Sequence, residues 1–172
     1  EHDENSQSIL ITNSKIFADQ VLEQIQNLLN TVSKKNIINL SLKKNGLIVL
    51  MDDLLLSYKI INKIAPEHLH LQSSEKQTIL KYVNNAGGIF LGDYSTEAFG
   101  DYVAGTNHIL PTSGAAKFSS GLGVIDFMKK SSVVEINKLS YENLSKHVEN
   151  ISDVENLDAH KLSVTIRQTK QN

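Results

Sequence analysis

Apolar and polar residues alternate along the first half of the chain in a pattern that predicts strands and helices in turn. Ser8–Thr12 (SILIT), Gly46–Met51 (GLIVLM) and Gly87–Leu91 (GGIFL) are short apolar runs, typical of buried strands, and the second run is typical of a strand covered on both faces. Residues 37–42 fit a helix or a strand. A helix is predicted between the first two runs by apolar residues that recur on one helical face: Val21, Ile25, Leu28, Leu29 and Val32.

A second helix is predicted after the middle strand. Asp52 or Asp53 can cap it, and it must end near Ile64 because Pro66 follows. Residues 75–83 are also predicted to be helical. Strands separated by helices indicate a mostly parallel sheet with helical crossovers. Ligands of such sheets bind beyond the carboxyl ends of the strands, which directs attention to the segment after the third strand.

Eight of the nine glycines lie in residues 87–123, which have little helical period. Long irregular segments inside a domain are usually functional, although a flexible linker is the alternative. Disorder is disfavoured by the apolar and aromatic content of the segment, namely Phe90, Tyr94, Phe99, Tyr102, Ile109, Leu110 and Phe118.

The remaining residues predict a small helical appendage. Residues 124–130 are expected to form a short helix, residues 132–136 an extended piece, and two helices follow. Ser152-Asp153-Val154-Glu155 has the capping-box pattern and predicts the start of the last helix. This part is too small to bury a core alone, so it must pack on the main domain or on another subunit. The first of the two helices is expected to present one apolar face, made of Leu144, Val148 and Ile151.

Composition excludes several classes of protein. The 172 residues are 40% hydrophobic with a net charge of −2, and they include no cysteine, so disulfide scaffolds, thiolate zinc fingers and cysteine nucleophiles are excluded. Both signs of charge are interspersed without a basic stripe, so no nucleic-acid partner is expected. There is no membrane-spanning run or signal-peptide pattern, so no membrane partner is expected and a cytoplasmic location is predicted.

Glu67 and His68 follow Pro66 and place a carboxylate beside an imidazole. An imidazole exchanges protons near neutral pH, and the carboxylate could activate a water molecule. Taken alone, Pro-Glu-His is more typical of a solvated turn.

Asp101 stands between Gly100 and Tyr102, and His108 follows seven residues later. A carboxylate on a glycine-flexible backbone suits a hard or borderline cation. The alternative is an Asx-type turn for Asp101 and a packing role for His108.

The last helix offers two more candidates. His160 lies close to its apolar face and is expected to be partly covered, whereas Glu155 has a competing structural role in the capping box. No histidine pair has close metal-ligand spacing, so any metal site must be assembled from distant segments. Residues 121–126 (GLGVID) start like a dinucleotide fingerprint, but they lack its third small residue and follow no strand, so they are not expected to bind a dinucleotide.

Taken together, these segments resemble the histidinol dehydrogenase family. The resemblance runs in family order over nearly the whole chain, and GDYVAGTNHILPT beside APEHL is its most specific part. The matching segments are Glu1-His2 with Ser6-Gln7, Ala65–Leu69, Asn85–Gly87, Gly100–Thr112, Phe118–Leu122, Asp126-Phe127 and Glu155–Arg167.

The resemblance implies an NAD-dependent enzyme of histidine biosynthesis that oxidises L-histidinol to L-histidinaldehyde and then to L-histidine. His68 would be the general base, and Glu67 would activate the water that adds to the aldehyde. His2, Asp101 and His160 would bind Zn²⁺, an ion that takes imidazole nitrogen and carboxylate oxygen. Substrate contacts are implied for His2, His68, Asp101, His108, Glu155 and His160.

The resemblance also implies a Rossmann-like organisation and a homodimer that exchanges its small terminal domains. Residues 1–122 would be the second half of an α/β catalytic domain, and residues 123–172 a small helical dimerisation domain. The NAD domain and the remaining zinc ligand, a glutamine expected before Glu1, would lie outside this chain, which is therefore expected to be an inactive fragment. Half a parallel sheet is expected to leave an apolar face uncovered. The alternatives are a non-catalytic dimerisation or scaffold remnant and an unrelated zinc hydrolase.

Overall fold

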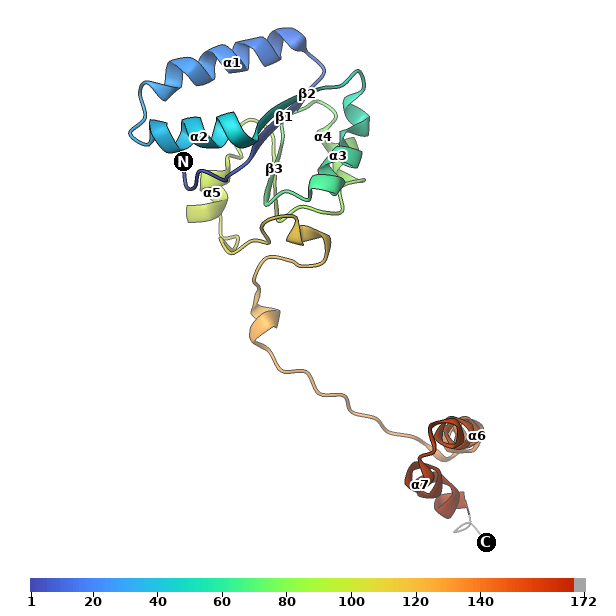
Figure 1. Ribbon diagram of the computed structural model, residues 1–172. Coiled ribbons are helices and arrows are strands. Elements are labelled where there is room, and N and C mark those ends of the chain that lie inside the picture. The colour runs from blue at the N-terminus through green and yellow to red at the C-terminus, as the bar shows by residue number, and fades with distance from the viewer. Residues whose placement is uncertain (169–172) are drawn as a thin grey trace. The chain divides into compact units, whose positions relative to one another are not determined.

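The computed structural model describes residues 1–168 of the chain. It divides into two compact units, Glu1–Phe127 and Met128–Asn172, which are described separately (Figure 1). The first unit is mixed α/β with parallel strands, as the sequence predicts, and the second is helical. Among the described helices, none is long and apolar enough to cross a bilayer.

The first sheet contains two parallel strands joined by helices. β1 (Ser8–Thr12) pairs along its whole length with β2 (Gly46–Leu50), and α1 (Lys15–Leu29) and α2 (Lys35–Asn45) form the connection. The hydroxyl of Ser14 accepts from the Phe17 amide at 3.2 Å and so caps α1. Both strands and α1 confirm the apolar pattern, and the ambiguous residues 37–42 are helical.

The second sheet pairs β3 (His68–Leu71) in parallel with β4 (Gly88–Leu91). β4 was predicted, whereas β3 was not. Because successive side chains of a strand point to opposite faces, His68 and His70 share one face of β3, and the two leucines between and after them share the other. The leucines lie in the core with the buried residues of α3 and α4; the cluster is Ile61, Leu69, Leu71 and Ile79.

The segment before β3 follows the sequence prediction closely. Asp53 accepts from the Leu55 amide at 2.9 Å and caps the 3₁₀ turn η1 (Leu54–Leu56), which leads into α3 (Ser57–Ile64). Ala65 ends α3 in the left-handed conformation (φ 53°). After β3, α4 covers only Lys76–Leu80, which is shorter than the predicted residues 75–83.

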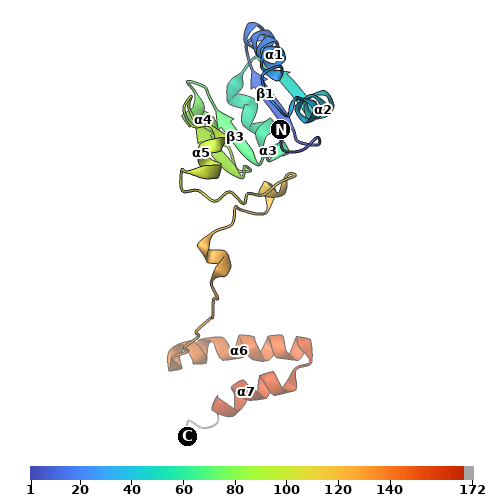
Figure 2. The same cartoon turned by 90° about the vertical axis from the view of Figure 1, so that its left-hand side faces the viewer.

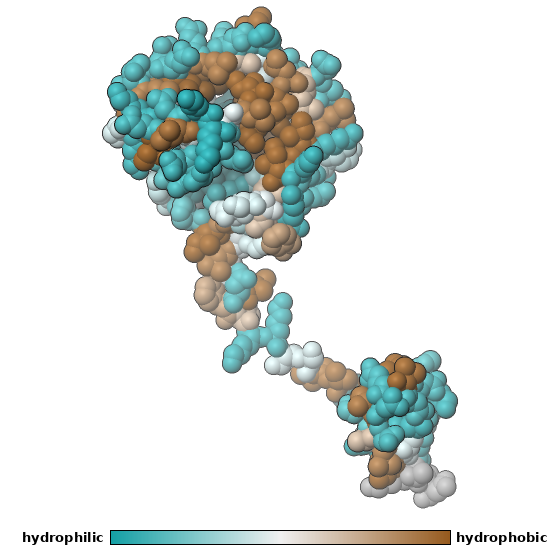
Figure 3. Space-filling view, viewed as in Figure 1, coloured by the Kyte–Doolittle hydropathy of each residue, from teal (hydrophilic) through white to brown (hydrophobic). Residues whose placement is uncertain are grey.

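Exposed apolar side chains remain on the first unit, and Figure 3 shows a broad apolar area on it. Leu47 and Leu50 of β2 are 52% and 50% exposed, so the prediction of a strand covered on both faces is wrong for this chain. A two-stranded sheet has too few neighbouring elements to cover both faces. The exposed leucines agree with the uncovered apolar face expected of half a sheet.

The glycine-rich segment is more regular than its composition suggests. It contains α5 (Glu97–Tyr102) and the 3₁₀ turn η2 (Ala115–Lys117), and η3 (Val124–Phe127) follows. The interior glycine of α5 is buried. The helix was missed because glycine is a poor helix former, and here a packing requirement outweighs that preference.

The second unit is a pair of consecutive helices, α6 (Lys138–Glu155) and α7 (Asp158–Gln168), which pack against each other and run antiparallel (Figure 2). Asn137 caps the start of α6, and Asn156 ends it in the left-handed conformation (φ 56°). The capping-box prediction is therefore wrong: residues 152–155 form the last turn of α6. The predicted apolar face of α6 is exposed in this unit: Leu144 48%, Val148 40% and Ile151 60%.

Gly87→Ala is expected to destabilise the first unit by about 1–3 kcal/mol, the usual cost of overpacking. A Cβ at this position would lie 2.6 Å from the Glu67 carbonyl oxygen, which accepts from the Gly88 amide in the β3–β4 ladder. Urea unfolding measures the change. Gly123→Ala is the matched control, because its nearest neighbour, an Asp126 carboxylate oxygen, would be 3.7 Å away. Equal effects of the two substitutions would contradict the packing argument.

Candidate functional site

Two imidazoles and one carboxylate meet in the first unit, although they come from distant parts of the sequence. Asp101 Oδ1 lies 3.5 Å from His68 Nε2 and 3.1 Å from His108 Nδ1. The carboxylate is 15% exposed, His68 28% and His108 65%. The cluster therefore has a covered carboxylate and one imidazole that is open to solvent.

The close approach of α5 to the second sheet positions Asp101. A Cβ on Gly100 would lie 2.6 Å from the Phe90 ring of β4, so glycine is needed for this contact. The Gly100 carbonyl oxygen accepts from the Thr106 hydroxyl at 3.1 Å, which ties the following loop to the helix. Asp101 is thus presented by a packed helix, and the expectation of a flexible glycine backbone or an Asx turn is wrong.

The cluster lies at the amino end of β3, since His68 is the first residue of that strand. The expectation of a site beyond the carboxyl ends of the strands is therefore wrong for these residues. The segment after β4 does supply Asp101, but α5 runs back along the sheet: its first residue, Glu97, lies near His70, and Asp101 lies near His68.

His108 lowers the pKa of Asp101 by hydrogen bonding to the carboxylate, and the nearby His68 adds a smaller electrostatic lowering, while burial acts in the opposite direction. A carboxylate with a lowered pKa stabilises the fold above the ordinary aspartate value of about 3.9, and this contribution is lost as pH falls through the lowered value.

We expect His108→Gln to raise the pKa of Asp101, because the substitution removes the first of these causes. A carboxyl-carbon NMR titration of the chain measures the change, with His147→Gln in α6 as the matched control. An unchanged titration of Asp101 in His108→Gln would show that His108 does not stabilise the carboxylate.

His68 Nε2 is buried and has no hydrogen-bond partner, and it is the one such side-chain atom among residues 1–168. Its ring lies against Phe90, with centroids 5.8 Å apart, and the 3.5 Å to Asp101 is longer than a good hydrogen bond. A buried polar atom without a partner costs about 1–3 kcal/mol. A group that brings a proton donor to this atom would therefore be bound favourably.

Glu67 is half-buried, directly before His68 at the start of β3. Its backbone is fixed, because its carbonyl oxygen accepts from the Gly88 amide at 2.7 Å. Its side chain makes no hydrogen bond or ion pair in the described structure. The Glu67 carboxylate therefore has no partner among the described residues.

Three predicted site residues are not part of this cluster. His2 lies elsewhere in the first unit, and Glu155 and His160 lie in the second unit. His2 is exposed and makes no hydrogen bond or ion pair with another described residue, and Glu155 and His160 are exposed in the helical unit. The expectation that His160 is partly covered is therefore wrong for this chain. Over residues 1–168, no group of three or more histidine, aspartate and glutamate side chains is arranged to hold a metal ion.

The side chain of His70 makes two polar contacts that were not predicted from the sequence. Its Nε2 lies 2.7 Å from the Gly92 carbonyl oxygen, and its Nδ1 lies 3.5 Å from Glu97 Oε1. The alternation His-Leu-His-Leu over residues 68–71 could have predicted both the strand and the shared face of its two histidines.

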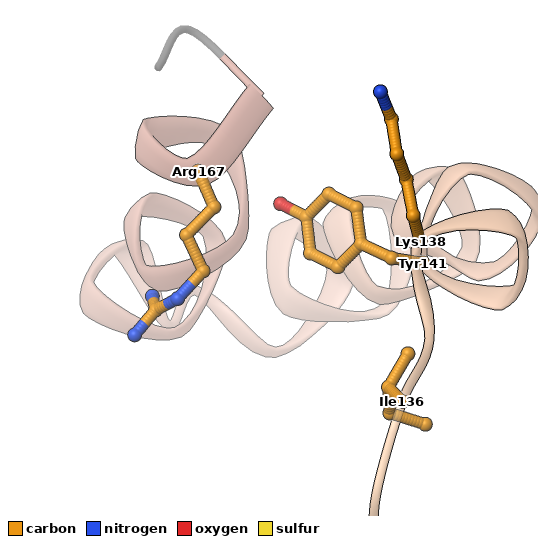
Figure 4. A pocket seen from close by; sticks show the side chains of 4 residues that line it. All are labelled: Ile136, Lys138, Tyr141 and Arg167. Carbon is orange, nitrogen blue, oxygen red and sulfur yellow. The ribbon is translucent and has the colours of Figure 1, made fainter. Parts of the chain in front are cut away.

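A shallow hollow in the helical unit is unrelated to these residues. It has a volume of about 250 Å³, and Figure 4 shows that its two basic side chains, Lys138 and Arg167, point away from one another. The hydroxyl of Tyr141 donates to the Val164 carbonyl oxygen of α7, and the Arg167 guanidinium donates to that of Ser163. The Tyr141 bond joins α6 to α7, whereas the Arg167 bond lies within α7, and the two groups do not converge on a ligand.

Parallel strands with helical crossovers and a cluster of imidazoles around a carboxylate define an α/β protein with side chains capable of acid–base chemistry. The family model for histidinol dehydrogenase matches residues 1–168. The chain belongs to the histidinol dehydrogenase family, as its motifs predict.

Curated relatives and a solved structure agree with this assignment. The chain is 44% identical over 168 residues to histidinol dehydrogenase of Aquifex aeolicus and 43% identical over 171 residues to that of Rhodospirillum rubrum. These matches cover 98% and 99% of this chain and 39% of each relative. The crystal structure of histidinol dehydrogenase from Elizabethkingia anophelis matches with a TM-score of 0.90 and 34% identity, over 98% of this chain and 39% of that one.

Proposed function

We propose that this chain supplies the acid–base pair of an NAD-dependent enzyme that oxidises L-histidinol to L-histidinaldehyde and then to L-histidine. The chain spans 39% of the length of the curated relatives, so the complete reaction also needs residues that this chain does not contain. In this proposal the residues that bind NAD are among those that this chain does not contain.

The buried, unpartnered Nε2 of His68 carries the proposal. Neutral imidazole nitrogen is a suitable base near neutral pH, and a substrate hydroxyl is the proton donor that this atom lacks. In the first oxidation His68 Nε2 would take the hydroxyl proton, and NAD, when bound, would accept the carbon-bound hydrogen as hydride. The proposal requires the substrate hydroxyl to reach this nitrogen, which the described side chains bury in the absence of substrate.

Glu67 serves the second oxidation in this proposal. Its half-buried carboxylate has no internal partner, so it is free to accept a proton from the water molecule that adds to the aldehyde. The hydrated aldehyde would then give up its second hydride to bound NAD, one hydroxyl proton to His68 and the other to solvent, which leaves the carboxylate of histidine. With no cysteine in the chain, none of its residues can form a thiohemiacetal with the aldehyde.

Zinc is the proposed metal, with His2, Asp101 and His160 as ligands from this chain. Their imidazole nitrogens and carboxylate oxygen are the donors that zinc takes, although the described residues by themselves do not assemble three of them. Bound zinc would hold the imidazole and amino nitrogens of histidinol. The lowered pKa of Asp101 favours its ionised form, which is the form that binds a metal ion.

The remaining assignments are also proposals. His108, Glu155 and the proposed zinc ligands contact histidinol, and the enzyme is a homodimer in which residues 123–172 form the small dimerisation domain. The exposed apolar side chains of α6 support a role for this part in association.

A chimera tests the proposal. The matched 39% of the Aquifex aeolicus enzyme is replaced by residues 1–172 of this chain, and histidinol-dependent NADH formation is measured with zinc present. Two NADH and one histidine per histidinol are expected. A folded, zinc-loaded chimera without turnover would favour the alternative, a dimerisation or scaffold remnant of the same fold.

A further inference from the structure

Two histidine–carboxylate contacts connect β3 to α5, and only one of them belongs to the proposed catalytic cluster. His68 Nε2 lies 3.5 Å from Asp101 Oδ1, and His70 Nδ1 lies 3.5 Å from Glu97 Oε1. Figure 2 shows α5 beside β3, as these contacts require. The second contact has no role in the chemistry proposed above.

The spacing of the two contacts matches the geometry of their elements. Two residues of a strand advance about 6.6 Å and return the side chain to the same face. Four residues of a helix advance about 6 Å and also return to nearly the same face. The pair His68 and His70 therefore faces the pair Asp101 and Glu97 in only one alignment, and a shift of α5 by one residue would break both contacts.

His70 also fixes the turn that leads into α5. Carbonyl and carboxylate oxygens only accept, so His70 Nε2 carries a hydrogen and donates to the Gly92 carbonyl at 2.7 Å. The contact with Glu97 is favourable in the form of His70 that also carries a hydrogen on Nδ1. Gly92 has a φ of +84° and its amide donates to the Leu71 carbonyl, where β4 ends. One side chain, 18% exposed, thus contacts both the end of β4 and the first turn of α5.

We infer that His70, together with Glu97, is a positioning residue that sets the alignment of α5 on β3 and thereby holds Asp101 against His68. The pair acts through the helix and touches no reacting group. The inference rests on the proposed role of Asp101, but the contact itself can be measured without histidinol, zinc or NAD.

Amide hydrogen exchange on the chain tests the inference. The reporters are the amides of Val103 and Ala104, which donate to the Phe99 carbonyl in the last turn of α5. Glu97→Gln removes the charge of one partner, and His70→Gln keeps a donor for Gly92 but loses the nitrogen that faces Glu97. Each is expected to speed exchange of both amides about tenfold, the effect of losing one ordinary contact.

The double variant and a control separate positioning from general loss of stability. The double variant should exchange no faster than the single variants, since all three lose the same contact. Glu75→Gln, on an exposed carboxylate in the same unit, should leave the exchange rates of the α5 amides unchanged. The exchange rate of the Met51 amide, which donates to Thr12 in the first sheet, should be unchanged in every variant. Ring-proton resonances of His68 and His108 should shift in Glu97→Gln and stay in place in Glu75→Gln.

Two results would overturn the inference. One is exchange of the α5 amides at the same rate in Glu97→Gln as in the unchanged chain. The other is an equal acceleration of the Met51 amide, which would mean that the whole unit is destabilised. Because Glu97 is 44% exposed, its substitution remains a usable test even where His70→Gln prevents folding. An inactive chimera with these exchange results intact would contradict the proposed function alone.

Discussion

Replacing His68 with asparagine lowers kcat for histidinol oxidation in the chimera by about 10²- to 10⁴-fold, the usual contribution of a general base. Asparagine keeps a polar side chain at the start of β3 but cannot take the hydroxyl proton. The effect follows from the one buried ring nitrogen that has no partner among the described residues. Steady-state NADH formation measures it, and histidinol binding should change far less than kcat.

The matched control is His147→Asn, on an exposed histidine of α6 whose side chain makes no hydrogen bond or ion pair with the described residues. Its kcat should equal that of the unchanged chimera. A His68→Asn chimera that keeps more than about a tenth of the original kcat would show that His68 is not the general base.

Replacing Asp101 with asparagine weakens zinc binding to the chimera by at least about 100-fold. Loss of a partner outside the ligand shell already costs 10- to 100-fold, so loss of a ligand should cost more. Asparagine has nearly the same shape and its amide oxygen can still accept from His108, so the change isolates the charge. Competition with a chromophoric chelator measures the affinity.

Asp126→Asn, on an aspartate whose carboxylate accepts from the Gly123 amide, is the control and should keep full zinc affinity. Equal affinities of the Asp101 and Asp126 variants would exclude Asp101 as a ligand. The His68→Asn variant, by contrast, should lose turnover and keep its zinc.

The sequence predicts the elements whose pattern is long or unambiguous. The strands at Ser8 and Gly46 and the first helix follow from continuous apolar runs and helical spacing. The strand at His68 was missed because four residues with two histidines give a weak signal. The short helix that carries Asp101 was missed because the packing of Gly100 on Phe90, which requires glycine, depends on tertiary structure.

The division between α6 and α7 illustrates a different error. Ser152 and Glu155 satisfy the capping-box pattern, but Asn156 adopts the left-handed conformation that ends a helix. Asparagine adopts that conformation more readily than most residues, so the competing stop signal was present in the sequence.

The candidate site was identified from motifs and not from spacing. His68 and Asp101 are far apart in the sequence, and only the alignment of α5 on β3 brings their side chains to 3.5 Å. Local patterns favoured a turn at each position, whereas the family motifs identified both. The motifs did not point to His70, because its contacts with Gly92 and Glu97 appear only in the folded chain.

A crystal structure of the chimera with zinc and histidinol is the most direct measurement of the proposed chemistry. We expect the histidinol hydroxyl oxygen within about 2.6–3.2 Å of His68 Nε2, the range needed for proton transfer. We also expect Asp101 to be bound to zinc. Histidinol bound elsewhere, with His68 Nε2 still enclosed by protein, would contradict the account.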